Sequence, residues 1–251
     1  MPKTNLKKLG SATAKGGFRN EDAVVKKFNN WQSDGDAQKW LKIMGYNLKE
    51  IEKVIAVKIH GYKTDVQVQI TIYLKQAISA ENLSVKLVSN PQGFNQVDKR
   101  WVNTYAKMWD MPSNVVMALK LFTGETHPTK TGLGDPRRMF LNEMGEKTQK
   151  NIVDFFKANK ILVVSDILKG RGKLSAGWML VVLKKPTQDK IWVLKSINHA
   201  LNVFGGGDVE ITNKGSLRIG KITMQRKGGD AGRDTSKMLQ FKINPVELFD
   251  N

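Results

Sequence analysis

Hydrophobic positions recur about every 3.6 residues in some stretches of the chain and every second residue in others. The first spacing, typical of amphipathic helices, is clear where Val24 and Phe28 follow Asn20, a residue type that favours helix N-termini. Ser113 predicts the start of a later helix in the same way, and Gly124 predicts its end. Stretches predicted to be helical are 20–31, 36–44, 95–108, 113–124 and 147–159.

The alternating spacing predicts β-strands with one buried face. In 65–74, Val68, Ile70 and Ile72 alternate with polar residues. Predicted strands are 54–60, 65–74, 83–88, 161–167 and 178–183, followed by a strand-to-helix passage over 191–204 and further strands over 209–243. Because helices and strands interleave along the chain, the pattern indicates an α/β or α+β fold with one mixed sheet.

Charge narrows the class of partner. The 251 residues include 41 Lys and Arg against 23 Asp and Glu, a net charge of +18. A balance this basic predicts a polyanionic partner, with nucleic acid first and a membrane surface only as an electrostatic alternative. The start of the chain shows no signal peptide, and no apolar run approaches the roughly 20 residues of a membrane helix.

Several kinds of chemistry are excluded by residue type. Cysteine is absent, which rules out disulfides, thiolate nucleophiles, Cys-ligated zinc and iron–sulfur clusters, and which fits a reducing, cytoplasmic location. The three histidines, His60, His127 and His199, lack metal-ligand spacing, and neither a serine nucleophile elbow nor a phosphate-binding loop occurs.

A carboxylate and a lysine on two predicted strands form a candidate catalytic pair. Asp65 begins the strand over 65–74, and Lys86 lies on the face of 83–88 opposite its apolar side chains. If these strands are neighbours, both side chains stand over one side of the sheet. Metal-dependent phosphodiester cleavage uses such a pair, in which the acid binds Mg²⁺ and the amine orients or deprotonates a water. The alternative is that both residues are simply solvated.

A second candidate is the basic tail over 220–245, which carries six Lys and Arg against two Asp. Gln225 and Arg226 are side chains that pair with adenine or guanine edges, and Gly228 and Gly229 allow backbone to approach a phosphate. We therefore expect nucleic-acid contact here, with a basic hairpin of no binding role as the alternative. The pair Arg137 and Arg138 is expected to be solvated or to face a phosphate.

Longer strings in this order resemble a known family. They include GYKTDVQVQI at 61–70 and GFNQVDKRW at 93–101, and the full set is 13–31, 61–70, 85–90, 93–101, 168–172 and 220–249. The chain resembles the small type II restriction endonucleases that recognise the palindrome GCGC and cut it after the first G.

This resemblance implies a nuclease of the PD-(D/E)xK type, with a central mixed β-sheet flanked by helices. It implies one endonuclease domain over 1–251, with a catalytic core at about 15–125 and a DNA-recognition part at about 160–251. The implied reaction is Mg²⁺-dependent hydrolysis of double-stranded DNA that leaves 5′-phosphates and 5′ overhangs.

When the family's motif is carried over by position, it assigns catalytic roles to particular residues of this chain. Asp65 would bind the metal, Lys86 would be the active-site lysine, and Glu21 would be a further metal-linked acid or else a plain first-turn acid. The chain departs from the pattern at Ser84, where the family has Glu, Asp or Gln. A hydroxyl is a poorer Mg²⁺ ligand, so the Val85 carbonyl, phosphate oxygens and waters would complete most of the metal shell with Asp65. Ser84, as a catalytic residue, would bind weakly or through water.

The resemblance also implies a set of DNA-binding residues. Phe94 would wedge into the base stack, with packing in the core as its alternative. The full set is Phe94, Asn95, Gln96, Lys99, Gln225, Arg226, Lys227, Asp230 and Arg233. Two other functions stay open: a nucleic-acid-binding protein whose metal site has decayed at Ser84, and a structure-specific repair nuclease of the same fold. The implied partners are double-stranded DNA and a methyltransferase in the same cell. No membrane partner is expected, and the chain is expected to be a monomer or a homodimer.

Overall fold

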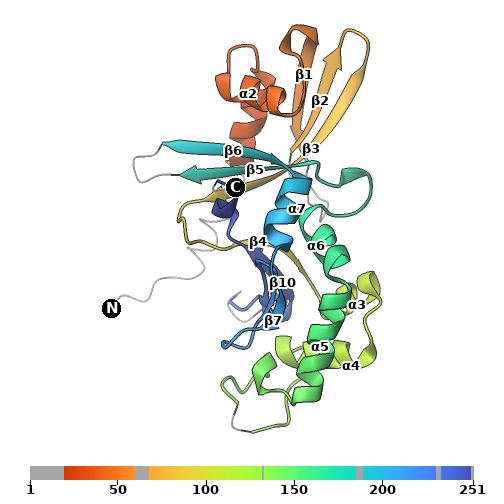
Figure 1. The fold of residues 1–251 in the computed structure, drawn as a ribbon. Helices are drawn as coiled ribbons and strands as arrows, with labels where there is room; N and C mark the ends of the chain where they lie inside the picture. The colour runs from red at the N-terminus through yellow and green to blue at the C-terminus, as the bar shows by residue number, and fades with distance from the viewer. Residues whose placement is uncertain (1–19, 60–67, 132, 185–188, 230–232, 250–251) are drawn as a thin grey trace, which may run out of the picture. The chain divides into compact units, whose positions relative to one another are not determined.

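The computed structural model describes residues 20–59, 68–131, 133–184, 189–229 and 233–249 (Figure 1). The chain forms two compact units, and each is assembled from separate stretches. The first unit comprises Met1–Asn95, Leu168–Leu201 and Asn244–Asn251, and the second comprises Gln96–Ile167 and Asn202–Ile243. The boundaries expected near 125 and 160 both fall inside the second unit.

The first unit contains the mixed sheet that the sequence predicts. Strands from two distant parts of the chain, orange to yellow and teal in Figure 1, make up this sheet. Its order is β1 (Ile51–Lys58), β2 (Val68–Leu74), β3 (Ile78–Val88), β5 (Trp178–Lys184) and β6 (Lys190–Ser196). Only β3 and β5 run parallel, and the other neighbours are antiparallel. The central strand is β3, paired on both edges.

Helices cover one face of this sheet. A helix over 20–29 and α2 (Gly35–Ile43) place Phe28, Trp40 and Leu41 in the same apolar cluster as the strands. Val68, Ile70 and Ile72 are fully buried, as the alternation in β2 predicts. Strand residues in the cluster are Ile51, Val54, Ala56, Val68, Ile70, Ile72, Leu83, Val85, Leu180 and Leu194.

The second unit contains a second five-stranded sheet, which the sequence did not predict. Its order is β4 (Asn95–Arg100), β10 (Leu239–Ile243), β9 (Ile222–Arg226), β8 (Leu217–Ile219) and β7 (Val209–Ile211). Its helices are α3 (Val102–Trp109), α4 (Ser113–Thr123), α5 (Glu146–Ala158) and α6 (Lys160–Leu168), and α7 (Ile197–Gly205) follows β6 across the boundary between units. Short 3₁₀ turns are η1 (Leu48–Glu50), η2 (Leu141–Glu143), η3 (Gly172–Leu174), η5 (Asp234–Lys237) and η6 (Pro245–Leu248).

Two predicted elements are wrong. The helix expected over 95–108 is instead β4 followed by α3, because 95–100 pairs into the second sheet. The strand expected over 161–167 is α6, in which Val163, Val164 and Ile167 are buried. A short apolar run does not distinguish a buried strand from a buried helix. None of the described helices is long and apolar enough to span a membrane.

Candidate functional site

The central strand β3 places Ser84 and Lys86 on the sheet face opposite the helices. Leu83 and Val85 enter the apolar cluster on the helix side, and side chains alternate along a strand. Ser84 is 2 % exposed and Lys86 is 8 % exposed, and a lysine is rarely buried to this extent. An amine held this deeply presents its nitrogen from a fixed position on this face of the sheet.

Asp65, the predicted partner of Lys86, lies outside the described residues. It precedes Val68, the first residue of β2, by three positions. Val68 is the Cα partner of Leu83 in the antiparallel β2–β3 ladder. The condition that these two strands are neighbours is therefore met, and the position of the Asp65 carboxylate stays a prediction.

The predicted metal ligands are not brought together within the described part of the chain. Glu21 is partly exposed on the helix over 20–29, which packs against the Leu83 and Val85 face of the sheet. In the described residues no group of three or more His, Asp or Glu side chains is arranged to hold a metal ion. A magnesium site in this chain therefore depends on Asp65, and its assignment stays a prediction.

The segment predicted to enter DNA is partly available to solvent. Phe94 is 54 % exposed, which contradicts its alternative assignment to the core. Asn95 donates its side-chain amide to the Leu87 carbonyl at 2.8 Å, so it supports the turn between β3 and β4. Gln96 is exposed and Lys99 is partly exposed on β4.

Those predicted tail residues that the structure describes lie at the end of the β9–β10 hairpin. Gln225 and Arg226 are the last two residues of β9, and the Lys227 amide bonds to the Met238 carbonyl at 2.8 Å. Arg233 is exposed, and Asp230 lies outside the described residues. The structure therefore places Arg226 and Lys227 where the hairpin strands separate.

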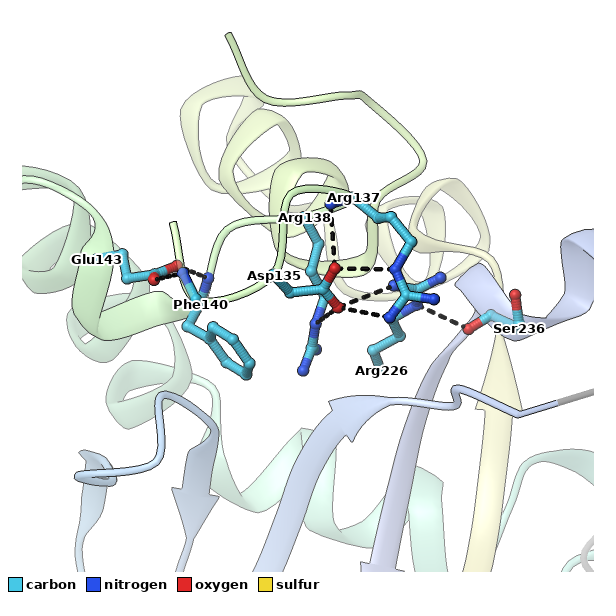
Figure 2. A network of polar contacts seen from close by, with 8 residues as sticks. Asp135, Arg137, Arg138, Phe140, Glu143, Arg226 and Ser236 are labelled. Atoms are coloured by element: carbon cyan, nitrogen blue, oxygen red, sulfur yellow. Dashed lines mark hydrogen bonds and ion pairs between the residues drawn. The ribbon is translucent and has the colours of Figure 1, made fainter. Parts of the chain in front are cut away.

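Arg226 belongs to a charged pocket that the sequence predicted only in part. We call this site the arginine pocket; its volume is about 210 Å³ and its lining residues are Asp135, Arg137, Arg138, Arg226, Gly228, Gly229 and Ser236. Figure 2 shows the three guanidinium groups arranged around the carboxylate of Asp135. All of these residues belong to the second unit.

Asp135 binds the three arginines with different geometries. Arg137 makes a bidentate contact, with Nε 2.8 Å from Oδ1 and Nη2 2.9 Å from Oδ2. Arg138 Nε lies 3.5 Å from Oδ2, and Arg226 Nη1 lies 3.9 Å from the same oxygen. Hydrogen bonding from Arg137 lowers the pKa of the Asp135 carboxyl to about 2, although its partial burial acts in the opposite direction. Asp135 therefore stays ionised under ordinary conditions.

Crowding of like charges is evident at the two less exposed arginines. Burial lowers the pKa of Arg138, and the nearby Arg226 lowers it further. Burial also lowers the pKa of Arg226, and the charge of Arg137 adds to this effect. The lining therefore holds more positive charge than Asp135 neutralises.

A family model now assigns the chain. The model that describes the R.HinP1I restriction endonuclease matches residues 44–249, which is most of the sequence. This chain belongs to the R.HinP1I restriction endonuclease family. It is thus a type II site-specific deoxyribonuclease, the class that the resemblance implied. No curated protein sequence matches the chain.

A solved structure supports the fold of this R.HinP1I family member. The crystal structure of restriction endonuclease MspI in complex with its cognate DNA has a TM-score of 0.61 and 12 % sequence identity, covering 89 % of this chain and 87 % of that chain. The similarity confirms the predicted fold class, a PD-(D/E)xK-like arrangement with a central mixed sheet flanked by helices.

Sequence reasoning missed the role of Asp135. The adjacent pair Arg137 and Arg138 was expected to be solvated or to face a phosphate, but nothing connected that pair to the tail. Asp135 and Arg226 are far apart in the chain, and a single sequence carries no signal for that contact. The local signal was the string DPRR itself, in which an acid precedes two arginines across a proline.

Proposed function

We propose that this endonuclease hydrolyses both strands of double-stranded DNA at the palindrome GCGC. It cuts after the first G, leaves 5′-phosphates and 5′ overhangs, and requires Mg²⁺. The observation that carries the catalytic part of the proposal is Lys86, an almost fully buried lysine on the central strand of the mixed sheet, beside the strand that follows Asp65. Membership of a restriction endonuclease family makes this lysine a catalytic candidate. The sequence GCGC and the cut position come from the family resemblance.

In the proposed mechanism, the scissile phosphate lies over β3. Asp65 and the Val85 carbonyl would hold the metal, with Glu21 as a further acid. Mg²⁺, when bound, polarises the phosphate and lowers the pKa of its bound water. The Lys86 ammonium orients the attacking water or the phosphate oxygen that faces it. Ser84, at 2 % exposure, contributes at most a neutral hydrogen bond or a contact through water.

DNA binding is proposed for two segments. Phe94, Asn95, Gln96 and Lys99 approach the bases from the turn after β3 and from β4. The tail adds further proposed DNA-binding residues, namely Gln225, Arg226, Lys227, Asp230 and Arg233. The partner is double-stranded DNA, and a methyltransferase in the same cell protects that cell's own DNA from cleavage. The chain acts as a monomer or a homodimer.

A digest of one fully sequenced plasmid tests the proposal. Parallel reactions contain Mg²⁺ or EDTA, and the ends of the products are mapped. Discrete fragments that end within GCGC, only with Mg²⁺, are the expected result. Cleavage at another sequence would refute the specificity, and intact DNA that shifts on a gel would refute catalysis.

Two lysine variants test whether cleavage depends on the proposed site. Lys86→Ala removes the buried cation, and the control Lys39→Ala removes an exposed lysine on α2 of the same unit. We expect loss of cleavage only for Lys86→Ala, with DNA binding retained by both variants.

A further inference from the structure

The arginine pocket has an excess of positive charge in a confined space. Its lining holds three guanidinium groups and one carboxylate. The exposed fractions of the side chains are 15 % for Asp135, 17 % for Arg138 and 10 % for Arg226, so these three charges are largely shielded from water, whereas Arg137 opens to solvent. An anion that enters the pocket would relieve the repulsion among the arginines.

The size of the pocket limits what that anion can be. A volume of about 210 Å³ is below the roughly 300–1,000 Å³ typical of sites for drug-sized ligands. A phosphate group fits this limit and matches the fork of donors that arginine presents. At the edge of the pocket, a side chain added at Gly228 or Gly229 would meet no atom of the described residues within 4 Å, so these residues leave room for a polymer chain.

Arg226 is held in a way that suits a phosphate better than a base edge. Its Nε donates to the Ser236 carbonyl at 3.1 Å, and its side chain is 10 % exposed. An arginine that reads guanine must extend its terminal nitrogens into the major groove. With Nε bonded and the side chain enclosed, Arg226 can present its remaining donors only to a group that comes to the pocket.

Arg137 and Arg138 have different roles in the same pocket. The Arg137 side chain is 73 % exposed, yet its guanidinium is oriented by two bonds to Asp135. Arg138 stacks over the Phe140 ring, with Cζ 4.1 Å from the ring centroid. Its buried Nε faces Asp135 Oδ2 at 3.5 Å, an ion-pair distance too long for a good hydrogen bond. The Arg137 guanidinium is therefore exposed to a ligand in solvent, whereas the Arg138 guanidinium adds a shielded charge to the lining of the pocket.

We propose that the arginine pocket binds one phosphate of the DNA backbone, with Arg137 and Arg226 as donors and Asp135 as the residue that positions them. This site deepens the proposed function, because it rests on DNA as the partner. It contributes affinity without regard to base sequence, which separates it from the residues proposed to read GCGC.

Salt dependence of DNA binding tests this site without any cleavage. Affinity for a GCGC duplex and for a duplex lacking GCGC is measured in EDTA over about 50–300 mM NaCl. For Arg137→Ala we expect the slope of log K against log salt to fall by about one, and both duplexes to bind more weakly by a similar factor of about ten. Arg137→Lys keeps the charge, so it should restore most of the slope while losing the bidentate geometry.

Arg218→Ala is the matched control. Arg218 is an exposed arginine of the same unit that pairs with Glu210 and does not line the pocket. Thermal melting of each variant checks folding. A slope equal to wild type in Arg137→Ala would overturn the proposal, and so would a loss confined to the GCGC duplex, which would indicate base reading.

A second arm distinguishes DNA phosphate from a free anion. A methylphosphonate replaces one charged phosphate of the duplex by a neutral group. When single methylphosphonates are placed along the duplex, one position should weaken DNA binding by the wild-type protein, and the same position should leave DNA binding by Arg137→Ala unchanged. If inorganic phosphate at constant ionic strength stabilises wild type but not Arg137→Ala, while DNA binding is unchanged, the pocket takes a free anion and the proposal fails. Failure of GCGC cleavage would leave the slope on either duplex unaffected, so the two proposals fail separately.

Discussion

Burial of Ser84 and Lys86 on one strand predicts unequal effects of their substitution. Loss of one neutral hydrogen bond costs about 1 kcal/mol, so Ser84→Ala should reduce the cleavage rate by roughly tenfold at most. Lys86→Ala removes a fixed charge from a low-dielectric site and should reduce the rate on the order of 10²–10³-fold. Asp65→Asn should abolish nearly all activity if Asp65 is the principal metal ligand. Single-turnover rates on one duplex measure all three.

Folding of the same variants must be checked, since Lys86 is buried. Lys86→Met keeps most of the apolar stem and should melt close to wild type while remaining inactive. Equal and severe loss in Ser84→Ala and Asp65→Asn would show that the hydroxyl is a direct ligand, contrary to the role given to it here.

Asp135 is expected to stabilise the folded chain in a pH-dependent way. Its folded-state pKa, about 2, lies below the ordinary value of 3.8, so the stabilisation is present above about pH 4 and is lost as pH falls through 2. At pH 7, Asp135→Asn should lower the free energy of unfolding by about 1–2 kcal/mol, because hydrogen bonds to a charged group are lost. Urea unfolding from pH 7 to pH 2 should show this difference shrinking below pH 4.

The exposed acid Asp154 provides the comparison. It pairs with Lys150 one helical turn away, with both side chains more than half exposed. Asp154→Asn should change stability by less than about 0.5 kcal/mol, as is usual for exposed pairs. A difference for Asp135→Asn that persists unchanged at pH 2 would contradict the ionic origin of its effect.

At the scale of elements, the end of α4 fixes the loop that carries the arginines. Gly124 follows α4 with φ +77°, and a Cβ atom there would lie 2.6 Å from the Arg137 carbonyl oxygen. Gly124→Ala should therefore destabilise the fold by roughly 1–3 kcal/mol and also weaken DNA binding by displacing Arg137. Chemical unfolding and the affinity for a duplex measure the two effects.

Gly45 offers a control with the same backbone demand. It follows α2 with φ +92°, but an added Cβ atom would meet nothing within 4 Å. Gly45→Ala should show the cost of the left-handed conformation alone and no change in DNA affinity. Equal effects of the two substitutions on stability and on binding would indicate that contact with the Arg137 loop is unimportant.

Elements were predictable where one periodicity dominated. The alternation in β2 and the helical spacing of α5 gave the correct element types because each has one apolar and one polar face. The run ILVVSDI in α6 is rich in β-branched residues, which favour strands locally, yet it forms a helix with Val163 and Val164 buried. Residues 95–100 were predicted to be helical but form strand β4, because pairing into a sheet is decided by residues far away in the chain.

The candidate site was predictable to a similar extent. Alternation predicted one strand that begins at Asp65 and another that carries Lys86. The structure contains both as β2 and β3, and it adds that they are neighbours. The arginine pocket was not predictable in full, because Asp135 and Arg226 meet only through the tertiary fold. Long-range contacts of this kind leave no periodic trace in a single sequence.

At the scale of the whole molecule, each compact unit depends on distant parts of the chain, which predicts that the first unit cannot form from the N-terminal part alone. A chain of residues 1–167 lacks β5 and β6, so β3 loses its parallel neighbour, and the core loses Leu180 and Leu194. Burial of each leucine contributes about 1.5–3 kcal/mol, a large share of a typical stability of 5–15 kcal/mol. We expect 1–167 to lack a cooperative thermal transition for this sheet by circular dichroism, and addition of 168–251 to restore it together with cleavage. Cooperative melting and activity of 1–167 alone would show that the N-terminal strands are a self-sufficient catalytic core.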